Sequence, residues 1–141
     1  MKLNLSRVDM WTATIEDRAG GAADMIEPLA AAGANLEFVF ARRMPEHPGR
    51  GILFVAPVKG KKAVKAAQEA GLAKSDNVCA LRIEGLDKAG VTAQLVRALA
   101  NAGISFRALS AAAIGSKFVA YLALDTAADA TKANAVLKKL S

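Results

Sequence analysis

The sequence repeats itself at an offset of 70 residues, and this repeat constrains the fold more than any other feature. When residues 17–36 are aligned with residues 87–106, eight of the 20 pairs are identical: Asp17, Ala19, Gly20, Ala23, Leu29, Ala30, Ala32 and Gly33 in the first copy. Other pairs are conservative, such as Met25 with Leu95. A repeat of this kind indicates two copies of one supersecondary unit.

Each copy predicts the same order of elements, which is strand, helix, strand, strand and helix. Alternating apolar residues predict the strands, and apolar residues at helical spacing predict the helices. The expected elements of the first copy are residues 10–15, 21–32, 35–41, 52–58 and 61–70. Those of the second copy are residues 78–84, 91–102, 104–112, 118–124 and 127–140. We therefore expect a first module over residues 1–72 and a second module over residues 73–141.

This order of elements predicts an α+β fold with two ferredoxin-like modules. A right-handed crossover between parallel strands places both helices of a module on one face of an antiparallel sheet. Each copy offers only three strands, so the sheets either lack a fourth strand or obtain it from residues 3–7 and from strand exchange. Open sheet edges favour pairing with another chain, and we expect a homodimer.

The turn before the first helix and the segment after it have the same pattern in both copies. Residues 17–20 and 87–90 read Asp-Arg-Ala-Gly and Asp-Lys-Ala-Gly. Residues 32–36 and 102–106 read Ala-Gly-Ala-Asn-Leu and Ala-Gly-Ile-Ser-Phe. This pattern resembles the ACT domain, in which an acidic-basic-Pro-Gly turn, a helix and Gly-Ile-Asn-Ile follow a strand. The resemblance extends over nearly the whole chain, as two ACT-like modules.

The resemblance implies a regulatory protein rather than an enzyme. ACT domains bind an amino acid at an interface between two modules and transmit the signal to an enzyme, which here would be a separate protein. Two departures from the family pattern distinguish this chain: Ala19 and Ala89 replace the usual Pro, and Ser105 replaces the usual Asn in the second copy. We therefore do not expect the two copies to bind equally.

The residue types at the turns suit a small zwitterionic ligand. Backbone N–H groups at a helix N-terminus attract a carboxylate, and a glycine allows close approach to them. The aspartates could hold an ammonium group, and Asn35 or Ser105 could add a polar contact. The candidate ligand-binding residues are therefore Asp17, Gly20, Gly21, Ala22 and Asn35 in the first copy, and Asp87, Gly90, Val91, Thr92 and Ser105 in the second. We favour the first copy, where Gly21 follows Gly20. The alternative is that these residues are only turn and cap formers.

No pattern in the sequence indicates catalysis, a metal or a cofactor. The single histidine, His47, has no other His and no Cys near it, as a zinc site would require. There is no pairing of a nucleophile with a base and no phosphate-binding loop. Cys79 is expected in the core, because it alternates with the apolar residues of its strand. We therefore expect no catalytic residues, no metal site and no cofactor.

Composition favours a packed chain in the cytoplasm and leaves two other functions open. Hydrophobic residues make up 53% of the chain, yet no apolar stretch is long enough to span a membrane. The N-terminus becomes charged too early for a signal peptide. The net charge of +6 comes partly from lysines on helix faces, which we interpret as solvated. A ligand-free interaction module is the alternative function, and RNA binding is less favoured because no aromatic-rich RNA motif is present.

Overall fold

The computed structural model describes all 141 residues, and these form two compact units. The first module consists of Asp9–Ser75, and the second module consists of Met1–Val8 together with Asp76–Ser141. The N-terminal segment therefore belongs to the second module, although the sequence alone placed residues 1–8 in the first. The reason is strand pairing, because this segment joins the sheet of the second module.

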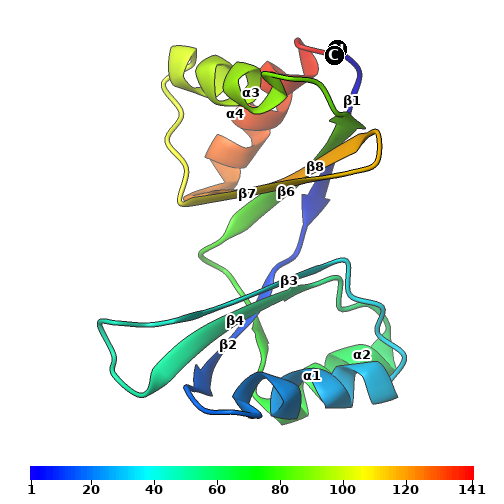
Figure 1. The fold of residues 1–141 in the computed structure, drawn as a ribbon, viewed down its shortest axis with the longest axis vertical. Coiled ribbons are helices and arrows are strands. Elements are labelled where there is room, and N and C mark those ends of the chain that lie inside the picture. The colour runs from blue at the N-terminus through cyan, green and yellow to red at the C-terminus, as the bar shows by residue number, and fades with distance from the viewer. The chain divides into compact units, whose positions relative to one another are not determined.

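The first module is an antiparallel sheet with two helices on one face (Figure 1). Its elements in chain order are β2 (Trp11–Glu16), α1 (Gly21–Ala31), β3 (Phe38–Arg43), β4 (Arg50–Ala56), α2 (Lys61–Ala70) and β5 (Ala73–Lys74). The strand order across the sheet is β3-β4-β2-β5. The helices α1 and α2 pack against each other as well as against the sheet.

The second module repeats this arrangement. Its elements are β1 (Leu3–Val8), β6 (Cys79–Leu86), α3 (Val91–Asn101), β7 (Ala108–Ile114), β8 (Lys117–Leu124) and α4 (Ala127–Lys138). The strand order is β1-β6-β8-β7, and every pair is antiparallel. Figure 1 shows α3 and α4 on the same face of this sheet. The expected α+β, ferredoxin-like class is therefore confirmed for both modules.

Both sheets have four strands, so the alternative of three-stranded sheets is wrong, whereas the alternative in which residues 3–7 supply a strand is confirmed. In the second module β1 supplies it, pairing with β6 from Leu3 opposite Gly85 to Val8 opposite Ala80. In the first module β5 supplies it with only two residues, which pair with Trp11 and Thr12 of β2. The outer edge of β2 is thus covered over a third of its six residues.

Each module has its own apolar core between sheet and helices. The first core consists of Trp11, Ala13, Leu29, Leu53, Val55, Val58, Ala63, Ala67 and Leu72. The second core includes Leu81, Ile83, Leu95, Leu99, Phe118, Leu122, Leu124 and Leu137. In β4 the residues that face the helices are Leu53 and Val55. Ile52 and Phe54, which alternate with them, lie on the other sheet face.

Glycines define where the first helix of each module begins and ends. Gly20 and Gly90 precede α1 and α3 with φ angles of 88° and 86°. After the helices, Gly33 donates its N–H to the carbonyl of Ala30 and Gly103 donates its N–H to that of Ala100, and both glycines have the positive φ of a left-handed cap. None of the helices combines the length and the apolar character that crossing a membrane requires.

Candidate ligand-binding turns

Each module contains a cavity at its strand-to-helix turn, between the start of the first helix and an edge strand. In the second module the cavity measures about 270 Å³ and is lined from the turn and helix by Asp87, Lys88, Gly90, Val91, Thr92 and Ala93. Its sheet wall consists of Ala111, Ala112, Ala113 and Phe118. The corresponding cavity of the first module measures about 220 Å³ and is lined by Ile15, Glu16, Asp17, Arg18, Ala22, Ala41, Arg42, Arg43 and Gly51.

The two cavities are built from equivalent positions. The 70-residue offset that relates the turns also relates residues 41–43 of β3 to residues 111–113 of β7. The strand registers agree with this, because Arg43 lies opposite Gly51 and Ala113 lies opposite Phe118. The fold therefore presents the same site twice, with different side chains.

The helix N-termini at both turns lack side-chain caps. In α3 the N–H of Val91 bonds to the carbonyl of Lys88 and the N–H of Gln94 bonds to that of Gly90, whereas the N–H groups of Thr92 and Ala93 have no acceptor in the protein. Such uncapped N–H groups carry the partial positive charge of the helix dipole. They can therefore accept a carboxylate.

In the second module, the charged side chains of the turn are unpaired. Asp87 and Lys88 form no ion pair and no side-chain hydrogen bond, and their hydrogen bonds are made by the backbone, from the N–H of Asp87 to the carbonyl of Ser116 and from the N–H of Val91 to the carbonyl of Lys88. The first turn of α3 contains no acidic residue. This cavity thus offers an uncompensated carboxylate, an uncompensated ammonium group and two free backbone donors, beside a wall of alanines.

In the first module, Arg18 occupies the same position with its guanidinium fully engaged. Its Nε donates to Glu16 at 2.6 Å, its Nη2 donates to Asp24 at 2.6 Å, and its Nη1 donates to the carbonyl of Ala19 at 3.0 Å. The hydrogen bond with Glu16, followed by that with Asp24, raises the pKa of the Arg18 guanidinium above its ordinary value. Asp24 also places a negative charge in the first turn of α1.

The aspartate of the first turn is engaged as well. Arg43, from the edge strand β3, donates its Nε to both carboxylate oxygens of Asp17, at 3.1 and 2.9 Å. The equivalent of Arg43 in the second module is Ala113, which cannot form such a pair with Asp87. The first cavity therefore satisfies internally the charges that the second cavity leaves unpaired.

The structure brings some of the sequence-predicted residues together and separates others. Asp87, Gly90, Val91 and Thr92 line one cavity, and Asp17 and Ala22 line the other, where the adjacent Gly20 and Gly21 shape the turn. Asn35 and Ser105 are exposed and follow the C-terminal ends of α1 and α3. Because an 11-residue helix is roughly 16 Å long, these two residues lie at the far end from the turns.

The sequence analysis missed the edge-strand residues that form one wall of each cavity. These are Ala41, Arg42 and Arg43 in β3, and Ala111, Ala112 and Ala113 in β7. A signal for them was present, because continuing the 70-residue alignment beyond Leu36 pairs Arg43 with Ala113 directly. What the sequence could not show is that this strand runs beside the helix N-terminus.

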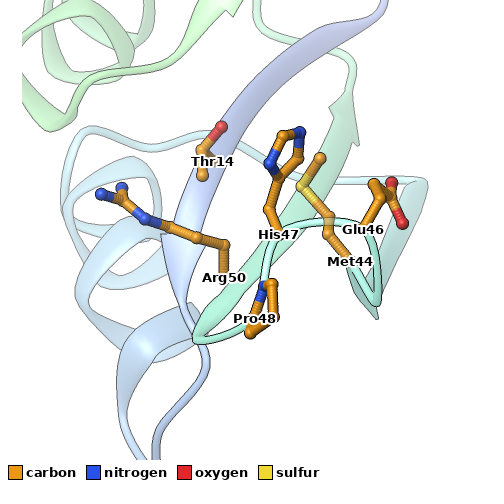
Figure 2. Close-up of a pocket in the computed structure, with 6 residues that line it drawn as sticks. All are labelled: Thr14, Met44, Glu46, His47, Pro48 and Arg50. Atoms are coloured by element: carbon orange, nitrogen blue, oxygen red, sulfur yellow. The ribbon is translucent and has the colours of Figure 1, made fainter.

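A third cavity, of about 580 Å³, has no counterpart in the second module. Figure 2 shows that it is lined by Thr14 of β2, by Arg50 at the start of β4, and by Met44, Glu46, His47 and Pro48 of the hairpin between β3 and β4. This hairpin spans residues 44–50 between the paired Arg43 and Gly51, whereas residues 114–117 suffice between Ala113 and Phe118. No cluster of three or more His, Cys, Asp or Glu side chains that could hold a metal exists in the protein.

Solved structures of other proteins share this two-module arrangement. A protein from Bacteroides thetaiotaomicron matches with a TM-score of 0.77 and 17% identity, over 97% of this chain and 89% of that chain. The ligand-free regulatory subunit of aspartate kinase from Thermus thermophilus matches with a TM-score of 0.65 and 18% identity, over 96% and 92%. The chain has a tandem ACT-type fold.

The structure of the aspartokinase alpha and beta subunits agrees, with a TM-score of 0.64 and 20% identity over 99% of this chain and 96% of that chain. No protein-family model and no curated protein sequence matches the chain. Identities of 17–20% establish a shared fold. The resemblance to the ACT domain that the turn pattern indicated is therefore confirmed at the level of the fold, and the function must be argued from the residues themselves.

Proposed function

We propose that this ACT-type protein is a regulatory module that binds an amino acid, or a similar small zwitterion, at its strand-to-helix turn. The observation that carries the proposal is the second-module cavity, where the unpaired Asp87 lies beside the uncapped N–H groups of Thr92 and Ala93. An α-carboxylate would bind the N–H groups, and an α-ammonium would bind the Asp87 carboxylate. The volume of about 270 Å³ is below the range of drug-sized pockets and suits a ligand of this size.

The energies of these contacts are sufficient for a useful affinity. Hydrogen bonds to a charged group contribute about 1.5–3 kcal/mol each. Two bonds from the backbone to a carboxylate, with an ion pair to Asp87, would supply much of the roughly 8 kcal/mol that corresponds to micromolar binding. The exposed position of Asp87 reduces its share, because solvent screens exposed ion pairs.

We further propose that ligand binding regulates a partner enzyme. The support is the fold, because structures that match over nearly the whole chain are regulatory subunits of aspartate kinase. Likeness at this level supports a regulatory role through a separate enzyme.

The test is a thermal-shift screen against the twenty amino acids at millimolar concentration. A ligand at a hundred times its dissociation constant stabilises the folded state by about 2.7 kcal/mol, so a ligand should raise the melting temperature measurably. The variant Asp87→Asn should lose the shift, and Asp76→Asn, which removes an exposed carboxylate of the same module, should keep it. A flat screen across all twenty compounds contradicts the proposal.

A second candidate function is a ligand-free docking module. It is favoured by the exposed apolar side chains Leu86 and Ile114, which are 61% and 80% exposed and lie at one end of the second sheet. Co-purification of a protein partner, together with an inert ligand screen and loss of the partner in Ile114→Lys, would favour this function over ligand binding.

A further inference from the structure

We infer that only the second module binds the ligand, and that the first module's turn is closed by its own side chains. This inference rests on the proposed function and concerns its stoichiometry and specificity. Both cavities occupy equivalent positions in their modules, so their aligned side chains can be compared pair by pair. The aligned pairs that differ in charge include Glu16 with Leu86, Asp24 with Gln94, Arg42 with Ala112 and Arg43 with Ala113, and Arg18 aligns with Lys88.

The negative end of a zwitterion has no favourable binding position at the first turn. A carboxylate at the free N–H groups of Ala22 and Ala23 would lie close to the carboxylates of Asp24 and Glu16. The cation of the turn itself, Arg18, already donates from all three of its nitrogens. At the second turn the residue equivalent to Asp24 is the neutral Gln94, and the ammonium group of Lys88 is unpaired.

The positive end of a zwitterion also finds no free partner at the first turn. At the first turn the Asp17 carboxylate is held by Arg43 through two contacts, and the long Arg42 and Arg43 side chains border the cavity. At the second turn the equivalent strand carries Ala112 and Ala113, so no cation from the strand competes for the Asp87 carboxylate.

The walls of the second cavity also define the class of side chain that the ligand carries. Ala111 and Ala113 face the helix side of the sheet, opposite Ala120 and Phe118. The other apolar walls are Val91 and Phe118, both of which are buried. The strand wall carries only alanines and Phe118, and the hydroxyl of the lining is that of Thr92 on α3, so we infer that the ligand is an amino acid with a small side chain. We therefore assign glycine, L-alanine and L-valine as the probes.

The test exchanges three of the differing positions between the modules. The variant Arg18→Lys/Asp24→Gln/Arg43→Ala gives the first turn the second module's residues at these three positions, and Lys88→Arg/Gln94→Asp/Ala113→Arg makes the reverse change. Each set leaves the net charge of the chain unchanged, because the acidic and basic changes cancel. All six positions are exposed, so the variants should fold, and circular dichroism verifies this. The single variants Arg43→Ala and Ala113→Arg test the effect of the edge-strand position alone.

Isothermal titration with the three probes measures the number of sites per chain. The expected result is one site in the wild type, two sites in the first-module variant and none in the second-module variant. Two sites in the wild type, or binding that survives in both second-module variants, overturns the inference and leaves the proposed function standing. Absence of binding in the wild type with these probes, when another amino acid binds in the thermal screen, overturns the assigned side-chain class. A wild type that binds none of the twenty overturns both proposals.

Discussion

Single residues decide how the two turns differ, and Gly21 shows how tightly the first turn is built. A Cβ atom at Gly21 would lie 2.2 Å from the carbonyl oxygen of Glu16, which no side chain can tolerate without backbone movement. At the equivalent position the second module has Val91, which is buried in its core. The strand-to-helix connections therefore differ in backbone path, and the glycine in the first module is needed for packing rather than for a ligand.

The variant Gly21→Ala should destabilise the first module. We expect a loss of about 1–3 kcal/mol, the range for overpacking a well-packed site, in urea unfolding followed by circular dichroism. Gly33→Ala is the control, because its Cβ would meet nothing within 4 Å and only its φ of 86° opposes the change. If Gly21→Ala were as stable as the wild type, the close approach to Glu16 would be wrong.

The ion pair between Arg82 and Glu84 on β6 predicts a pH effect. The hydrogen bond from Arg82 lowers the pKa of Glu84 below its ordinary value of 4.5. A carboxyl whose pKa is lower in the folded state contributes stability above its ordinary pKa, and this contribution is lost as the pH falls from that value through the lowered pKa of the folded state. Wild type should therefore exceed Glu84→Gln in free energy of unfolding at about pH 7, with the gap narrowing at about pH 3. A gap independent of pH would show that Glu84 titrates alike in both states.

At the scale of elements, the N-terminal strand β1 completes the second module. Its residue Leu3 is 8% exposed and belongs to the second core, and the N–H of Leu3 bonds to the Ser141 side chain at 2.7 Å. The Arg7 guanidinium bonds to Thr131 of α4 at 2.7 Å. The two ends of the chain are thus held by the same module.

Leu3→Ala should therefore destabilise the second module although it lies near the chain terminus. Removing a buried leucine side chain costs about 2–5 kcal/mol, and the strand-end position places our expectation at the lower limit. The neighbouring Asn4→Ala should change the free energy of unfolding little, because Asn4 is exposed. Equal effects of the two variants would contradict the placement of β1 in the core.

The local signals in the sequence located the helices well. The range 61–70 was predicted for α2 as observed, and α1 and α3 begin at the predicted Gly21 and Val91, because glycines with positive φ fix their first residues. The strand after each helix was placed three or four residues too early, since β3 starts at Phe38 and β7 at Ala108. Residues after the glycine cap continue as a loop, and alternation alone does not reveal where sheet pairing starts.

The long-range strand pairings could not be predicted from local sequence patterns. β1 pairs with β6 across more than 70 residues of sequence, and β5 has only two residues, too few for a periodic pattern. For the candidate site, the turns were found from their Asp and Gly residues. Asn35 and Ser105 were added by resemblance, and the structure places them at the opposite helix ends. Residues that belong to one sequence motif lie far apart in the structure when a helix separates them.

At the scale of the whole molecule, the edge strand β7 predicts self-association. Its outer edge has no partner in the sheet, and its seven residues include no charged residue or proline, which are the usual protection of an edge. The edge strand β3 ends in Arg42 and Arg43 and is better protected.

We therefore expect a homodimer that forms through β7. Light scattering coupled to size-exclusion chromatography should give twice the chain mass for the wild type and a lower mass for Ala112→Lys, since a lysine on an edge strand opposes pairing. Ala100→Lys, on the exposed side of α3, should remain dimeric. A wild type that is monomeric throughout, or an Ala112→Lys variant that stays dimeric, contradicts pairing through this edge.

We propose that the turn of the second module binds a small amino acid, and amide chemical-shift mapping can locate the bound ligand in the folded protein. Titration of ¹⁵N-labelled protein with L-alanine or L-valine should shift the amides of Thr92 and Ala93 most, followed by those of residues 111–113 in β7. The equivalent amides of Ala22 and Ala23 should stay in place, which provides an internal control in the same spectrum. No shifts at saturating ligand, or shifts centred on Ala22 and Ala23 instead, would contradict the account.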